Sequence, residues 1–121
     1  MIKLFSFYLI IYIYLYVISF NTAHKIIQIM TNLNKLYALY DVRSQKERDT
    51  LSDLLTNHLP KEYTSLVIQK LKRQGIYTDS QSVRNIKGGI SKNILVFNAI
   101  VEIANEYKTV SNRLKDNLRK E

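Results

Sequence analysis

The chain has 121 residues, with eighteen lysines and arginines against ten aspartates and glutamates, and its formal charge is +8 at pH 7. This basic balance favours a partner that carries phosphate groups, either nucleic acid or an anionic membrane face. The absence of cysteine excludes a disulfide framework and a thiolate metal site, while three glycines and one proline leave few breaks in a mainly helical chain.

Residues 4–20 form an apolar run without a charged side chain. The length of the run is compatible with a short membrane anchor, which needs about 17–20 apolar residues, and with a signal peptide, whose core has about 7–15. Its alternation of Ile and Tyr at positions 11–14 is also what a repeated A/T nucleotide pair encodes, and Met30 offers a second start. Residues 1–29 are therefore a mistranslated leader, a membrane anchor or a signal peptide, and we expect the working domain in residues 30–121.

Two amphipathic helices are predicted between residue 31 and Pro60. In residues 31–40 the apolar side chains recur every three or four positions, and Thr31 or Asn32 can cap the start. Residues 41–49 are polar and of mixed charge, so they form either a helical continuation or a connection. The second helix carries the apolar stripe Leu51, Leu54, Leu55 and Leu59, and it ends before Pro60 because a proline pushes the preceding residue away from helical angles.

Residues 61–88 predict a helix-turn-helix, two short helices joined by a tight turn. The first helix covers residues 61–74, and Gly75 is expected to end it with a positive φ. Thr78, Asp79 or Ser80 can accept hydrogen bonds from the free N–H groups of the second helix. The apolar face of the first helix is expected to consist of Tyr63, Leu66, Val67 and Leu71.

The second helix of this motif, residues 80–87, carries the candidate binding side chains. Val83 and Ile86 are three residues apart and are expected to face the core, which leaves the polar side chains outward. Gln, Asn and Arg can pair with adenine or guanine edges in a major groove, and Ser and Lys suit phosphate oxygens. The candidate DNA-binding residues are Ser80, Gln81, Ser82, Arg84, Asn85, Lys87, Lys92, Lys70, Lys72 and Arg73.

A long final helix is predicted after Gly88 and Gly89, which end the preceding one. Residues 91–93 can contact phosphate at the start of this helix, where free N–H groups favour an anion. Residues 110–121 are mostly polar and form either a frayed helix end, which we favour, or a dimerising extension. The buried face is expected to consist of Ile94, Phe97, Ile100, Val101, Ala104 and Tyr107.

Residues 59–108 resemble small DNA-binding proteins of phage and mobile-element type, the lambda repressor/Cro-like helix-turn-helix class. In that class a glycine ends the first motif helix, as Gly75 does, and the recognition helix has two apolar anchors three apart, as Val83 and Ile86 are. The step from Gly75 to Val83 is longer than is usual there, and Leu71 occupies the place of a small residue. These two departures from the class imply a longer turn and more widely spaced helices in this chain.

We therefore expect an all-α fold, a small helical bundle containing a helix-turn-helix and preceded by an apolar segment. The expected function is sequence-specific binding of double-stranded DNA by a cytoplasmic transcriptional regulator. One such module makes few base contacts, so useful specificity usually needs a dimer on half-sites about 34 Å apart, and a homodimer is possible. The alternatives are a small membrane protein anchored through residues 4–20 and a helical protein-interaction adaptor. No signature spacing of Ser, His or a phosphate loop points to an enzyme, a cofactor or a metal.

Overall fold

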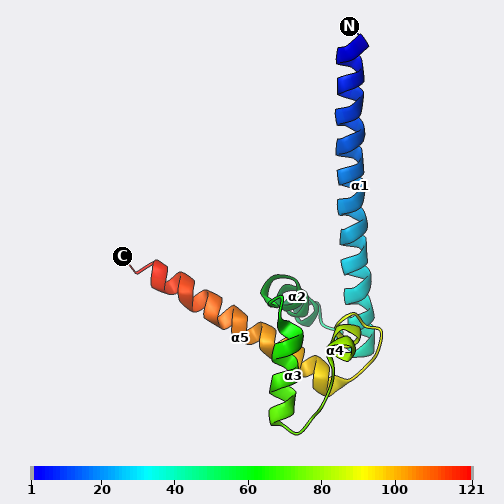
Figure 1. Cartoon of the computed structure of the whole chain (residues 1–121). Helices are drawn as coiled ribbons and strands as arrows, with labels where there is room; N and C mark the ends of the chain where they lie inside the picture. The colour runs from blue at the N-terminus through cyan, green and yellow to red at the C-terminus, as the bar shows by residue number, and fades with distance from the viewer. Residues whose placement is uncertain (1, 121) are drawn as a thin grey trace. The chain divides into compact units, whose positions relative to one another are not determined.

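A computed structural model describes residues 2–120 of the chain, with side chains from residue 6 onward. The described part is helical and contains no strand, which confirms the all-α prediction. Its elements are the α-helices α1 (Ile2–Leu39), α2 (Gln45–Asp53), α3 (Tyr63–Arg73), α4 (Ser80–Lys87) and α5 (Ile94–Leu118), with a short π-helix η1 (Leu54–His58) after α2 (Figure 1).

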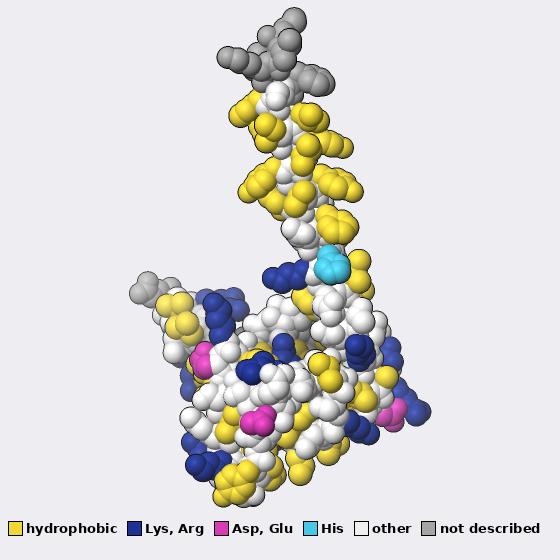
Figure 2. Space-filling model, turned by 45° about the vertical axis from the view of Figure 1, so that its right-hand side comes forward, with side chains coloured by type: hydrophobic (Ala, Val, Ile, Leu, Met, Phe, Trp, Pro, Cys, Tyr) yellow, Lys and Arg dark blue, Asp and Glu magenta, His cyan; other side chains and the backbone are white. Residues whose placement is uncertain are grey.

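The chain divides into two compact units, Met1–Asn32 and Leu33–Glu121, and the boundary falls inside α1. In the first unit every described side chain up to Met30 is exposed, including Tyr12 at 70% and Phe20 at 61%. Hydrophobic side chains surround the visible part of this stretch in Figure 2. By length and composition alone, Ser6–Leu39 is long and apolar enough to cross a membrane, a property that signal sequences share.

The last turns of α1 belong to the second unit, and Leu36 is one of its most buried side chains. Tyr40 stacks on Phe97 of α5 with 4.1 Å between the ring centroids, and its hydroxyl accepts a hydrogen bond from the N–H of Asn93. The prediction that a helix starts at Thr31 or Asn32 is wrong. Helix α1 runs through both positions, and the Thr31 hydroxyl donates to the Ile27 carbonyl one turn earlier.

Helix α2 begins at a serine cap and continues directly into η1. Ser44 accepts the N–H of Glu47, and residues 41–44 form the connection that the sequence left open. Leu51, Leu54 and Leu55 are buried as predicted. Leu59 has extended backbone angles in front of Pro60, so the helix ends where the proline rule places it.

A polar cluster around Asp53, the last residue of α2, connects α2 and η1 to α5. The Asp53 carboxylate accepts hydrogen bonds from Asn57 at 2.9 Å and Lys108 at 2.9 Å, and His58 Nε2 lies 3.4 Å away. The hydrogen bond from Asn57, followed by the contact with Lys108, lowers the pKa of Asp53 from 3.8 to about 2. The ionised form of this carboxyl is therefore favoured by folding.

This cluster predicts an acid-sensitive contribution to stability. A folded-state pKa below the unfolded value stabilises the protein above about pH 4, and the contribution is lost as the pH falls from there toward about 2. We expect Asp53→Asn to lower stability at pH 6 and to flatten the loss of stability between pH 4 and 2. Urea unfolding midpoints across this range measure the effect, with Asp116→Asn, an exposed carboxyl outside the cluster, as the control.

The core of the second unit lies where η1, α3 and α4 contact α5, and Figure 1 shows α3 crossing α5. Ile100 and Ala104 are fully buried, as predicted for the face of α5. The outer members of that prediction are wrong, because Ile94 is 67% and Tyr107 is 41% exposed. Since several elements cover α5, its buried face is broader than one stripe and also includes Val96, Ala99 and Ile103.

Candidate nucleic-acid interface

Helix α3 ends in a Schellman turn that sets the direction of the following segment. The N–H of Ile76 donates to the Leu71 carbonyl at 2.9 Å, and the N–H of Gly75 donates to the Lys72 carbonyl at 3.0 Å. Gly75 has φ +79°, as the sequence predicted. Ile76 packs against the core just after this turn, so the chain reverses with an apolar side chain as its anchor.

We expect Gly75→Ala to destabilise the protein by about 1–2 kcal/mol, because an L-residue is strained at this positive φ. No atom lies within 4 Å of the added Cβ, so backbone strain is the only cost that the geometry indicates. Gly88→Ala is the matched control, since Gly88 has φ −81° and its new Cβ would make an ordinary contact of 3.4 Å. Equal unfolding midpoints for the two variants would contradict this explanation.

Helix α4 is fixed at both ends by local hydrogen bonds. At its start the Asp79 carboxylate accepts the N–H of Ser82 at 2.7 Å, and this backbone hydrogen bond is the main cause that lowers the pKa of Asp79. At its end a second Schellman turn forms, with Gly89 at φ +77° and Ile90 N–H donating to the Asn85 carbonyl. The helix is therefore short and well defined.

One face of α4 is buried and the opposite face is polar. Val83 is fully buried and Ile86 is 4% exposed, which confirms that these two residues anchor the helix. Gln81 and Arg84 are exposed, and the other predicted polar residues are half-buried: Ser80, Ser82, Asn85 and Lys87.

The polar side chains of α4 form a hydrogen-bonded chain along its surface. Gln81 Nε2 donates to Asn85 Oδ1 at 2.9 Å, and a guanidinium nitrogen of Arg84 donates to Gln81 Oε1 at 3.3 Å. Each of these groups has further donors or acceptors available, because an amide carries two donor hydrogens and two acceptor lone pairs. The three side chains are thus held near one another on the outer face of one helix.

The lysines and arginines predicted as phosphate contacts are not equivalent. Lys72 and Arg73 are exposed at the end of α3, where they line a surface hollow of about 370 Å³ together with Gln69. Lys92 is exposed in the loop before α5. Lys87 Nζ lies 5.5 Å from the centre of the Tyr63 ring, a cation–π contact that joins the end of α4 to the start of α3.

Lys70 is held within the fold rather than presented to a ligand. Its Nζ lies 2.6 Å from Glu106 and 3.2 Å from Glu102, both on α5. The hydrogen bond to Glu106 is the largest cause that raises the pKa of Lys70. This ion pair connects α3 to α5, so we leave Lys70 out of the candidate interface.

The N-terminus of α5 also differs from the phosphate site expected in residues 91–93. Asn93 caps this helix, and its side-chain oxygen accepts the N–H groups of both Leu95 and Val96. These donors are already satisfied and do not present an open anion site.

Tyr77 is 79% exposed in the turn before α4 and was not among the predicted binding residues. The only signal in the sequence for its exposure was its position outside the apolar three-four pattern of the neighbouring helices.

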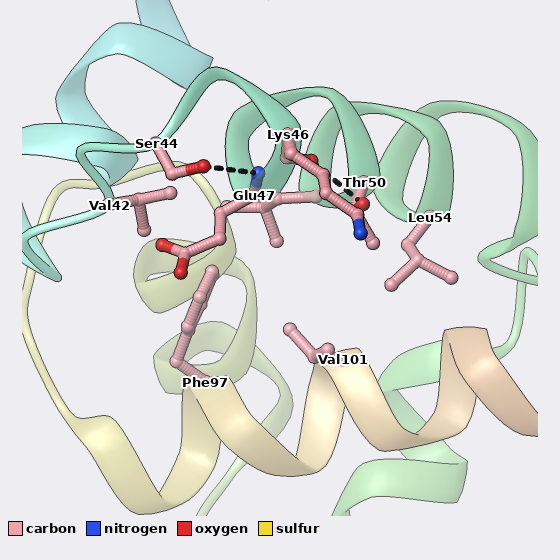
Figure 3. Close-up of a pocket in the computed structure, with 9 residues that line it drawn as sticks. Val42, Ser44, Lys46, Glu47, Thr50, Leu54, Phe97 and Val101 are labelled. Carbon is pink, nitrogen blue, oxygen red and sulfur yellow. Dashed lines mark hydrogen bonds between the residues drawn. The ribbon is translucent and has the colours of Figure 1, made fainter.

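A separate cavity of about 490 Å³ lies between α2 and α5. Figure 3 shows Phe97 rising from α5 toward the carboxylate of Glu47, and Val101 on the same helix facing the side where Thr50 and Leu54 lie. Ser44 and Lys46 also line the cavity. The lining is mainly apolar and holds no cluster that binds a metal. Throughout the described residues there is no group of three His, Cys, Asp or Glu side chains suited to a metal ion.

Comparisons with protein-family models, with curated proteins and with solved structures give no match for this chain. The described residues define the class of this protein as all-α.

Proposed function

We propose that residues 30–121 bind double-stranded DNA in a sequence-specific manner and act as a transcriptional regulator, with α4 in the major groove. The single observation that carries the proposal is the division of α4 into two faces. Val83 and Ile86 anchor it to the core, and Gln81, Arg84 and Asn85 lie together on the other face. These are the side-chain types that read purine edges through paired hydrogen bonds.

The charge of the second unit supports the same partner. Sixteen lysines and arginines and ten acidic residues occur in residues 33–121. Lys and Arg side chains are spread over the face of this unit that Figure 2 presents. Lys72, Arg73, Lys87 and Lys92 are the cations close in sequence to α4, and in the proposed complex they neutralise phosphates on either side of the groove.

The loss of one such cation should change the salt dependence of binding. We expect Lys72→Ala to weaken binding to specific and random DNA alike, and to lower the slope of log K against log salt by about one unit. Electrophoretic or fluorescence titrations at several salt concentrations measure that slope. Lys46→Ala, which removes an exposed lysine from α2, should leave the slope unchanged.

The proposal as a whole is tested by selection from random double-stranded DNA with the fragment 30–121 at two salt concentrations. We expect one enriched motif that persists at the higher salt, because base contacts survive when phosphate contacts weaken. Binding that shows no enriched motif, or no binding at all, would contradict a sequence-specific regulator.

A second candidate, a membrane-anchored protein, is favoured by a different observation. Residues 7–18 present large apolar side chains on all sides of α1, each at least 40% exposed. Such a surface suits lipid, where the backbone of a helix is already satisfied. Extraction of native membranes at high pH and identification of the N-terminal peptide decide between the candidates: a membrane-retained protein that begins at Met1 supports the anchor, and one that begins at Met30 rules it out.

A further inference from the structure

The cavity between α2 and α5 has the size and the lining of a site for a small organic molecule. Its volume of about 490 Å³ lies within the range of about 300–1,000 Å³ that such sites occupy. All its lining residues belong to the second unit, and none of them is a member of the candidate interface. The proposed DNA binding therefore gives this cavity no role.

The walls of the cavity are apolar and fixed in the core. Leu51, Leu54 and Phe97 are all buried, and Val101 is half-buried beside them. The ring of Phe97 is held in place by Tyr40, which stacks on it with 4.1 Å between the centroids. An apolar group that enters the cavity leaves water and contacts walls that are already ordered, which favours its binding.

Two opposite charges line the same cavity without contacting each other. Lys46 and Glu47 are consecutive residues of α2, and both are exposed. Among the described residues neither side chain forms an ion pair, so the Lys46 ammonium lies more than 4.0 Å from the Glu47 carboxylate. The carboxylate lies toward the ring of Phe97 (Figure 3). The cavity thus combines an apolar wall with one anion and one separate cation.

The hydroxyl groups that line the cavity are already engaged in local hydrogen bonds. Ser44 accepts the N–H of Glu47, and Thr50 donates to the carbonyl of Lys46. The two charged side chains are therefore the main polar groups that remain for a ligand.

This combination indicates a ligand that carries both charges and an apolar body. A purely cationic ligand would attract Glu47 and repel Lys46, and a purely anionic ligand would do the reverse. A zwitterion can pair with both. Free α-amino acids carry an ammonium and a carboxylate on one carbon, and those with large side chains also supply the apolar body that suits the walls.

We propose that the cavity between α2 and α5 binds a free α-amino acid with a large apolar side chain. The ligand ammonium pairs with Glu47 beside the ring of Phe97, which adds a cation–π contact. The ligand carboxylate pairs with Lys46, and the ligand side chain lies against Leu54 and Val101. This site does not depend on DNA binding, so it can hold or fail independently of the proposed function.

The first experiment compares five probes by isothermal titration calorimetry on the full chain in a mild detergent. We expect L-phenylalanine and L-leucine to bind saturably at concentrations below about 10 mM. Phenethylamine lacks the carboxylate and 3-phenylpropionate lacks the amine, so each should bind about fivefold more weakly than L-phenylalanine, the effect of one exposed ion pair. Glycine has both charges but no apolar body, and it should not bind detectably.

The second experiment assigns the two charges with variants that remove them one at a time. Glu47→Gln should weaken L-phenylalanine and phenethylamine about fivefold and should not weaken 3-phenylpropionate. Lys46→Gln should weaken L-phenylalanine and 3-phenylpropionate and should not weaken phenethylamine. Lys61→Gln and Glu62→Gln are the matched controls, because this second Lys-Glu pair is also exposed and lies outside the cavity. Both controls should bind every probe like the wild type.

A third variant, Val101→Phe, fills the cavity and should abolish binding of both amino acids. Circular dichroism checks its fold, and if it unfolds, the two charge variants decide alone. Three outcomes overturn the proposal. The first is no saturable binding of either amino acid up to about 10 mM. The second is binding of a singly charged probe as tight as that of L-phenylalanine. The third is binding of L-phenylalanine that both charge variants, or a folded Val101→Phe chain, leave unchanged.

Discussion

Replacing Leu71 by alanine should cost about 2–5 kcal/mol of unfolding free energy, the largest loss that we expect from one side chain near the candidate interface. Leu71 is 1% exposed and lies at the end of α3, where its carbonyl accepts the N–H of Ile76. Removal of the Leu71 side chain leaves a cavity between the two helices of the candidate motif. Urea unfolding of the fragment 30–121 measures the loss.

The neighbouring position supplies the control for this prediction. Lys72 is exposed, so Lys72→Ala should change stability by less than about 0.5 kcal/mol. Leu71 is 1% exposed, so a loss below about 1 kcal/mol for Leu71→Ala would contradict the packing described here.

Replacing Arg84 by alanine should weaken binding to the selected DNA site by about 1–3 kcal/mol, or roughly five- to 150-fold. Arg84 is exposed on α4, and it also donates to Gln81, which in turn donates to Asn85. The substitution removes a guanidinium that can donate to a guanine edge. It also removes the hydrogen bond that Arg84 donates to Gln81. The loss should concentrate on the selected site, with much weaker effects on random DNA.

Arg43→Ala is the matched control for Arg84→Ala. Arg43 is an exposed arginine paired with Asp41 at 2.7 Å, in the connection between α1 and α2. We expect this variant to bind specific DNA like the wild type. An equal loss for Arg84→Ala on specific and random DNA would remove Arg84 from base reading and leave it only a phosphate contact.

Local signals account for the parts of the fold that the sequence predicted well. Gly75, Pro60 and Asp79 each act on the backbone within a few residues, so the ends of α3 and the start of α4 were accessible from sequence. The burial of Val83 and Ile86 followed from helical spacing. The extent of the buried face of α5 could not be predicted in the same way, since it depends on several other helices.

The candidate interface likewise has one feature that the sequence predicted and one that it did not. The polar character of α4 is a property of eight consecutive residues and was predicted from them. The engagement of Lys70 by Glu102 and Glu106 was not predicted, because its partners lie more than thirty residues further along the chain. A charge count cannot distinguish a cation held by the fold from one free to meet a phosphate.

The burial of Leu36 has a consequence for where the chain can be shortened. Leu36 is 2% exposed, and Tyr40 stacks on Phe97, so the last turns of α1 close the core although the rest of that helix does not. A protease should remove the exposed residues before Asn32 without unfolding what remains, and digestion should then stop. A fragment that begins at Asp41 would lack both side chains and would leave part of the apolar interior open to water.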